Sequence, residues 1–280
     1  MNNNRLLLFL AGLLLFHFQL TLAQDLRDPE HTLKFADYLF KTKQFVLASE
    51  EYERLVYYDS LNYYPKLKLI QSYRYSSNYK NAISKFGYFF KDTLNKIRPD
   101  FAEEYVKNLI LDKRNKQAFN YLETNISLNP GTIQTYQLGT LLLDQNWDTA
   151  FNYAVKYGVT NSKQNADLHV VAFKSKQLKY KSPFAAAAMS SIIPGTGKMY
   201  TKHWKDGFMS LMFVGVNAWQ AYRGFKKSGQ NSVYGWVFAG LATSFYIGNI
   251  YGSAKSAKKY NKKLNDELYN ETWHLMVDDF

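Results

Sequence analysis

Cysteine is absent from the 280 residues, and proline and glycine are scarce, with 6 and 15 positions. Without cysteine the chain can form no disulfide, thiolate nucleophile, lipid-modified cysteine or Cys-ligated metal site. The scarcity of proline and glycine favours helices over a β-sandwich. Hydrophobic residues make up 46% of the chain and aromatic residues 17%, enough for a core held by packing alone. The composition therefore favours an all-α protein.

Catalytic and metal-binding patterns are also missing. The five histidines show no i, i+3 or i, i+4 pairing, so no metal site is predicted. No Gly-x-Ser-x-Gly segment occurs, and the carboxylate pair Glu103 and Glu104 is interpreted as a solvated helix face. Gly195–Lys198 is similar to the end of a phosphate-binding loop, but Ile192 and Met199 stand where that loop needs Gly and Ser or Thr. We expect no enzyme activity, no cofactor and no metal.

The formal net charge is +12, spread along the chain. The one dense run of cations, Lys255–Lys263, directly follows an apolar segment. Such a run suits the anionic headgroups at a membrane surface better than it suits nucleic acid. The sequence therefore predicts contact with membrane lipid and no binding of nucleic acid.

The first 23 residues have the pattern of a secretory signal. Arg5 precedes the apolar stretch Leu6–Leu22, and Thr21 and Ala23 supply the small residues that signal peptidase reads. Residues 1–23 are therefore predicted to be a signal peptide that is cleaved after Ala23. The alternative is an uncleaved membrane anchor, and under either interpretation the following residues are exported.

Four alanines recur at steps of 34, 36 and 32 residues, most of them in an aromatic frame. This is the period of a helical repeat whose units are helix pairs that cannot bury their apolar faces alone. The motifs are Phe45-x-x-Ala48-x-x-x-Tyr52, Tyr79-x-x-Ala82-x-x-x-Phe86, Ala118-x-x-x-Leu122 and Trp147-x-x-Ala150-x-x-x-Ala154.

Residues 24–181 resemble tetratricopeptide repeats in this pattern. The resemblance implies a helical superhelix whose concave face holds a protein or peptide partner. Alanine is expected where two helices cross closely, and a closing helix over residues 164–180 is expected to have Ser162 as its N-cap. An irregular helical bundle is the alternative. The residues predicted to pack the repeats are Ala48, Tyr52, Ala82, Phe86, Ala118, Trp147 and Ala150.

Residues 182–262 are predicted to form a membrane domain with two apolar helices, and residues 263–280 a polar tail. The run Val233–Gly252 carries no charge and is long enough to cross a hydrocarbon layer of about 30 Å. The run Phe208–Tyr222 is shorter and would need Trp204 and Tyr222 in the headgroup layers. The sequence thus predicts a transmembrane hairpin after the repeats. A buried hairpin of a water-soluble protein is the alternative.

The membrane region contains a series of motifs: Pro194-Gly195-x-Gly197-x-x-Tyr200, Trp204-x-x-Gly207 and Gly248-Asn249-x-Tyr251. In their order they resemble a bacterial two-helix membrane domain of unknown function. That resemblance implies location and architecture only. The prolines and glycines are expected to break one helix so that the next can start. Asn217 and Asn249 are expected to face another helix, which Gly248-x-x-x-Gly252 would let approach closely.

The predicted function is that of a scaffold, anchored in the cytoplasmic (inner) membrane of a bacterial cell envelope. Its exported repeats would lie on the periplasmic side and bind a protein or peptide. The alternative is a component of a small transporter or channel complex, with Asn217 and Asn249 lining a path. A two-pass hairpin is preferred to three passes, because the broken segment Phe184–Tyr200 is a poor span. No oligomeric state is predicted.

Overall fold

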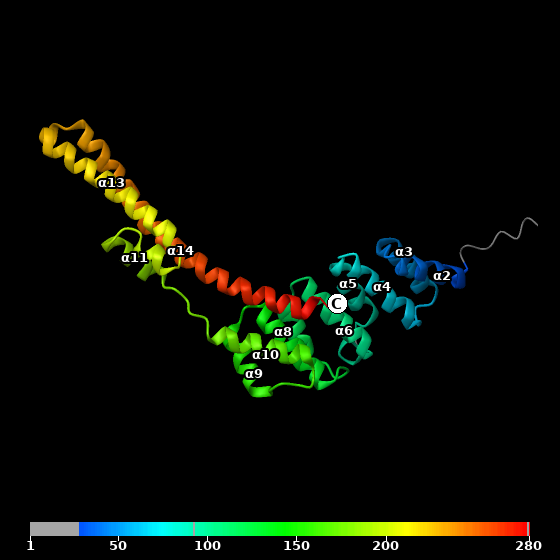
Figure 1. Ribbon diagram of the computed structural model, residues 1–280. Coiled ribbons are helices and arrows are strands. Elements are labelled where there is room, and N and C mark those ends of the chain that lie inside the picture. The colour runs from blue at the N-terminus through cyan, green and yellow to red at the C-terminus, as the bar shows by residue number, and fades with distance from the viewer. Residues whose placement is uncertain (1–27, 92, 279) are drawn as a thin grey trace, which may run out of the picture. The chain divides into compact units, whose positions relative to one another are not determined.

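The computed structural model describes residues 28–91, 93–278 and 280, which form helices and no strand (Figure 1). The predicted all-α class is confirmed. The predicted signal peptide, residues 1–23, lies outside the described residues. The chain divides into two compact units, Met1–Asn129 and Pro130–Phe280. This division differs from the predicted boundary at residue 181, which lies between two helices of the second unit.

The first unit consists of three consecutive helix pairs. Asp28 and Asn62 cap the first helices of two pairs by accepting hydrogen bonds from backbone N–H groups of the first turn. Pro29 and Pro99 occupy the first positions of their helices, where the missing N–H costs nothing. The elements are α2 (Pro29–Lys41), α3 (Phe45–Tyr58), α4 (Tyr63–Tyr75), α5 (Tyr79–Phe89), the 3₁₀ turn η1 (Leu94–Lys96), α6 (Pro99–Leu111) and α7 (Asn115–Thr124).

The two helices of every pair are joined by the same turn. One residue adopts a left-handed conformation, and the N–H of the next residue bonds to a carbonyl five positions back, which is a Schellman-type helix end. The left-handed residue precedes its repeat alanine by five positions each time. The left-handed residues are Lys43, Ser77 and Lys113 in the first unit, and Gln145 in the helix pair that begins the second unit. The backbone therefore repeats in step with the alanines, whereas membership of the tetratricopeptide class stays a prediction.

The repeat alanines lie where their helices cross. Ala48, Ala82, Ala118 and Ala150 have no exposed surface, and Tyr52 and Phe86 are equally buried. Tyr52 donates a hydrogen bond to Asp37 Oδ1 at 2.6 Å across the first pair. Burial and this hydrogen bond raise the pKa of Tyr52, so it stays a neutral donor at physiological pH. Trp147 differs in being only partly buried.

A buried ion pair connects the second and third helix pairs. Arg74 of α4 donates to both carboxylate oxygens of Glu104 of α6, at 2.8 and 3.0 Å, and both side chains are less than a tenth exposed. Burial alone would lower the pKa of Arg74, but the hydrogen bonds and charge of Glu104 outweigh it and raise that pKa. The interpretation of Glu103 and Glu104 as a solvated face is wrong for Glu104. Its position on α6 turns it towards α4 rather than towards water.

The second unit begins with a helix pair and ends with one very long helix. Ser162 accepts a hydrogen bond from Asn165 N–H, which confirms the predicted N-cap of α10. The elements are α8 (Pro130–Leu143), α9 (Trp147–Tyr157), α10 (Lys163–Lys176), α11 (Pro183–Ile192), α12 (Thr196–Tyr200), α13 (Trp204–Ser228), the 3₁₀ turn η2 (Gly229–Asn231) and α14 (Val233–Val277).

Helix α14 runs without a break from beside α13 to α8 and α10 (Figure 1). Residues 263–280, predicted to be a polar tail, largely continue this helix. Asn265 accepts hydrogen bonds from Trp147 Nε1 at 3.1 Å and from the Tyr180 hydroxyl at 2.6 Å. Met276 has no exposed surface and packs against Gly139 of α8. The end of the chain is therefore part of the core around α8 and α10.

No helix among the described residues is long and apolar enough to span a membrane. The length and hydropathy of the helices therefore do not support the predicted transmembrane hairpin over Phe208–Tyr222 and Val233–Gly252. Helix α13 includes Lys205, Asp206 and three cations near its end, and the first half of α14 contains small and polar side chains among its apolar ones.

Candidate functional site

Helices α13 and α14 form an antiparallel hairpin closed by η2. Midway along it, the rings of Phe213 and Phe245 stack with centroids 5.4 Å apart. Near the turn, the backbones approach so closely that a Cβ on Gly224 would lie 2.7 Å from the backbone N of Gly235. This contact needs glycine, and it holds the two helices together at the end where they join.

The opposite end of the hairpin is closed by α11 and α12. Gly195 has φ of 91°, a left-handed conformation that ends the segment after α11 and allows α12 to start. A methyl group on Gly195 would overlap the carbonyl oxygen of Gly207 at the start of α13. The prediction that the Pro194–Gly197 segment breaks one helix before the next is confirmed.

A chain of buried hydrogen bonds ties this turn to α14. Asn249 accepts from Gly195 N–H at 3.1 Å and donates to the Ser190 carbonyl at 3.4 Å. The hydroxyl of Ser190 accepts from Gly197 N–H at 2.9 Å and lies 2.7 Å from that of Ser253. Asn249 thus faces neighbouring elements, as predicted. Ser190 and Ser253 carried no sequence signal beyond their small size.

A second polar contact lies one turn further along α14. The hydroxyls of Thr201 and Ser256 are 2.6 Å apart, and His203 Nδ1 lies 3.1 Å from Ser256 Oγ. Lys202 repeats the left-handed turn of the helix pairs, five residues before Gly207, and His203 N–H again bonds to a carbonyl five positions back. Helices α12 and α13 are therefore joined in the same way as the helices of the repeats.

The other motif residues do not all meet in this junction. Lys181 Nζ lies 4.3 Å from the ring centroid of Tyr200 in a cation–π contact. Trp204 and Tyr251 are largely exposed. Asn217 is half-buried and donates to the Phe213 carbonyl of its own helix at 2.7 Å, so its contact with another helix stays a prediction.

The predicted close approach of another helix at Gly248 and Gly252 is wrong. A Cβ on Gly248 would meet nothing within 4 Å, and one on Gly252 would meet only the flexible end of Lys198. The close contacts lie at other glycines, because this part of α14 meets α11 and the Gly195 turn through Asn249 and Ser253 rather than through glycine.

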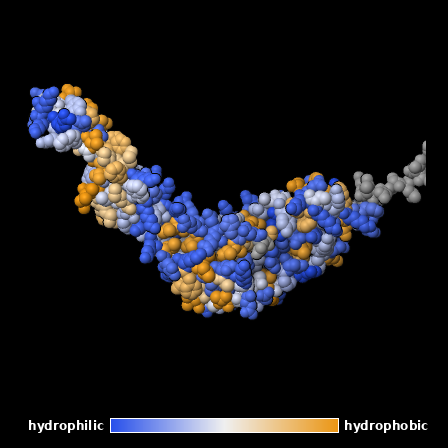
Figure 2. Space-filling view, in the orientation of Figure 1, coloured by the Kyte–Doolittle hydropathy of each residue, from blue (hydrophilic) through white to orange (hydrophobic). Residues whose placement is uncertain are grey.

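Large apolar side chains project from both helices of the hairpin into solvent. Figure 2 shows them as orange and pale atoms along its length, with hydrophilic atoms at the tip. Residues more than two-fifths exposed include Phe208, Met209, Met212, Phe213, Val216, Trp219, Tyr222, Val233, Tyr234, Trp236, Val237, Leu241, Phe245, Ile247 and Tyr251. A contiguous apolar surface of this kind marks a site of interaction with lipid or protein.

Cations flank this apolar surface, and carboxylates are nearly absent. Between Ser182 and Asn265 the sequence has 11 Lys and Arg residues and one acidic residue, Asp206. Arg223, Lys226 and Lys227 lie at the tip of the hairpin, and the remaining cations lie towards α12 and the middle of α14.

Comparison with protein families, curated proteins and solved structures gives no match for the chain. The resemblances to tetratricopeptide repeats and to a bacterial two-helix membrane domain therefore remain predictions.

Proposed function

We propose that the protein is a scaffold that binds a protein or peptide through its first unit and attaches to a membrane through the α13–α14 hairpin. The observation that carries the proposal is the apolar surface of the hairpin. Its exposed side chains would each gain about 25 cal/mol per Å² on leaving water. Lipid is preferred to protein as the covering partner because Trp, Tyr, Lys and Arg gather at its ends, as they do at membrane interfaces.

The charge pattern supports the same partner. The cations around the hairpin suit anionic headgroups, and a nearly complete lack of carboxylates avoids repulsion from them. In the alternative function, a transporter or channel component, Asn217 and Asn249 would line a path. Asn249 is buried in the junction and Asn217 bonds to its own helix, so neither side chain supports such a path. An envelope location and export of the first unit belong to the same proposal.

Replacing Val216, Val237 and Ile247 together with Asn should lower partitioning of the full chain into phosphatidylcholine vesicles at least 100-fold. Each side chain is half or more exposed, and burying one in lipid gains roughly 1.5 kcal/mol or more. Vesicle flotation measures the effect. The matched control replaces Val155, Val159 and Val170, which are equally exposed outside the hairpin. Equal losses in both triple variants, or none in the first, would contradict the proposed anchor.

Partner binding is assigned to the first unit because its surface is rich in tyrosine, a residue type enriched at protein interfaces. Its exposed tyrosines include Tyr38, Tyr57, Tyr58, Tyr63, Tyr64 and Tyr88.

A photo-crosslinking residue at Tyr57 or Tyr88 should capture the same protein in intact cells from both positions. Both side chains are more than four-fifths exposed, so the probe itself should leave the fold unchanged. Mass spectrometry identifies the captured protein, and a probe at the exposed Asn161 of the second unit is the control. Captures that do not differ between Asn161 and the two tyrosines would exclude a specific partner surface on the first unit.

A further inference from the structure

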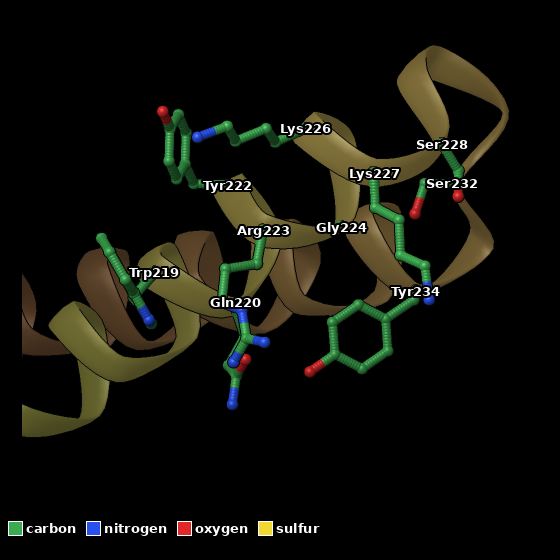
Figure 3. A pocket seen from close by; sticks show the side chains of 10 residues that line it. All are labelled: Trp219, Gln220, Tyr222, Arg223, Gly224, Lys226, Lys227, Ser228, Ser232 and Tyr234. Atoms are coloured by element: carbon green, nitrogen blue, oxygen red, sulfur yellow. The ribbon is translucent and has the colours of Figure 1, made fainter.

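The tip of the hairpin contains a hollow of about 770 Å³ formed by the end of α13, η2 and the start of α14 (Figure 3). Its walls combine cations, aromatic rings and hydroxyl groups, with no carboxylate among them. The lining residues are Trp219, Gln220, Tyr222, Arg223, Gly224, Lys226, Lys227, Ser228, Ser232 and Tyr234.

The helix period places the key side chains together. Trp219, Arg223 and Lys227 are spaced four apart, so they form one row along α13. Figure 3 shows Arg223 and Lys227 directed to the side of the hairpin where the ring of Tyr234 lies. The hollow therefore has two cationic groups beside an aromatic wall.

These cations are available for an anion. Arg223, Lys226 and Lys227 are exposed, and none of them takes part in an ion pair found among the described residues. The nearest acidic residues along the chain are Asp206 and Asp266, far from the tip in sequence. Three like charges within five residues repel one another, so a bound anion would relieve that repulsion.

We propose that this hollow binds the phosphate of an anionic phospholipid headgroup. Guanidinium binds phosphate oxygens through two parallel hydrogen bonds, and Lys227 would add a point charge. Trp219 lines the hollow, and the exposed side chains of Val216 and Met212 follow it on the same face of α13, so acyl chains can lie along them. That continuity with an apolar surface favours a lipid over a soluble phosphate. The inference rests on the proposed attachment of the hairpin to a membrane.

The test compares full-length wild type with Arg223→Gln/Lys227→Gln in flotation with vesicles. One vesicle type is phosphatidylcholine, and the other is an equimolar mixture of phosphatidylcholine and phosphatidylglycerol. The double variant should bind the anionic vesicles about 30-fold more weakly, since each cation near such a surface contributes about fivefold. Its binding to neutral vesicles should be unchanged. Both side chains are exposed, so the fold should be retained, which circular dichroism checks.

The matched control is Lys80→Gln/Lys91→Gln, which removes the same charge from exposed positions of the first unit. Equal losses in both double variants would mean that only net charge matters and would overturn the tip site. Wild-type binding that is equal for the two vesicle types would also overturn the tip site, but it would still support the proposed membrane anchor. Wild type that binds neither vesicle type would refute the anchor as well. Binding of inorganic phosphate to wild type but not to the double variant in calorimetry, with no loss of binding to anionic vesicles in that variant, would identify soluble phosphate and not lipid as the ligand.

Discussion

Replacing Glu104 with Ala should lower the free energy of unfolding of the first unit by about 3–5 kcal/mol. The substitution leaves the guanidinium of Arg74 buried and without its carboxylate partner, and the loss of hydration of an unpaired charge is not compensated. Urea unfolding of the full chain, followed by circular dichroism, measures the change as a shift of the transition that belongs to this unit.

The neighbouring Glu103 provides the control. Its carboxylate pairs with Lys107 at 2.9 Å and is two-fifths exposed, so Glu103→Ala should cost less than about 1 kcal/mol. A second variant, Arg74→Met with Glu104→Leu, removes both charges and should recover most of the lost stability. A cost for Glu104→Ala as small as that of Glu103→Ala would mean that the pair is not buried in solution.

Gly195→Ala should destabilise the junction below the hairpin by about 2–5 kcal/mol. The left-handed conformation costs a residue with a Cβ about 1–2 kcal/mol, and overlap with the Gly207 carbonyl adds about 1–3 kcal/mol because backbone cannot move aside easily. Tryptophan fluorescence during urea unfolding reports the change, since Trp204 starts the adjoining helix.

Two other glycines separate these causes. Gly229 also has a positive φ, 59°, with ψ of −153°, a region that favours glycine, but open space around it, so Gly229→Ala should cost only a conformational part of about 1–3 kcal/mol. Gly215 lies inside α13 with nothing within 4 Å, and Gly215→Ala should stabilise the helix by about 0.5–1 kcal/mol. If Gly195→Ala costs less than the conformational part alone, about 1–2 kcal/mol, the close approach to Gly207 is absent.

The repeat pattern could be predicted from sequence because it depends on local spacing. Alanine every 32 to 36 residues marks a helix crossing whatever lies around it, and Ala48, Ala82, Ala118 and Ala150 are all fully buried. Ser162 was identifiable as an N-cap for the same reason, since a cap bonds to its own first turn.

Other features depend on residues far apart in the chain and left no local signal. Arg74 and Glu104 are 30 positions apart, and each alone has the sequence pattern of a solvated charge. Glycine spacing suggested a contact at Gly248 and Gly252, but it cannot indicate which helix face meets a neighbour. Residues 263–280, after the run Lys255–Lys263, were predicted to be a polar tail, although lysine is a good helix former and α14 continues through both.

The continuity of α14 fixes the rotational phase of its two ends. At about 1.5 Å per residue its 45 residues extend roughly 68 Å, with the Asn249 junction on one part and the Asn265 and Met276 contacts on another. Each inserted residue would turn one end against the other by about 100°, because a helix has about 3.6 residues per turn. The number of residues between Ser256 and Asn265 is therefore constrained, because it sets the angle between the two contact faces of α14. The identity of those residues can vary.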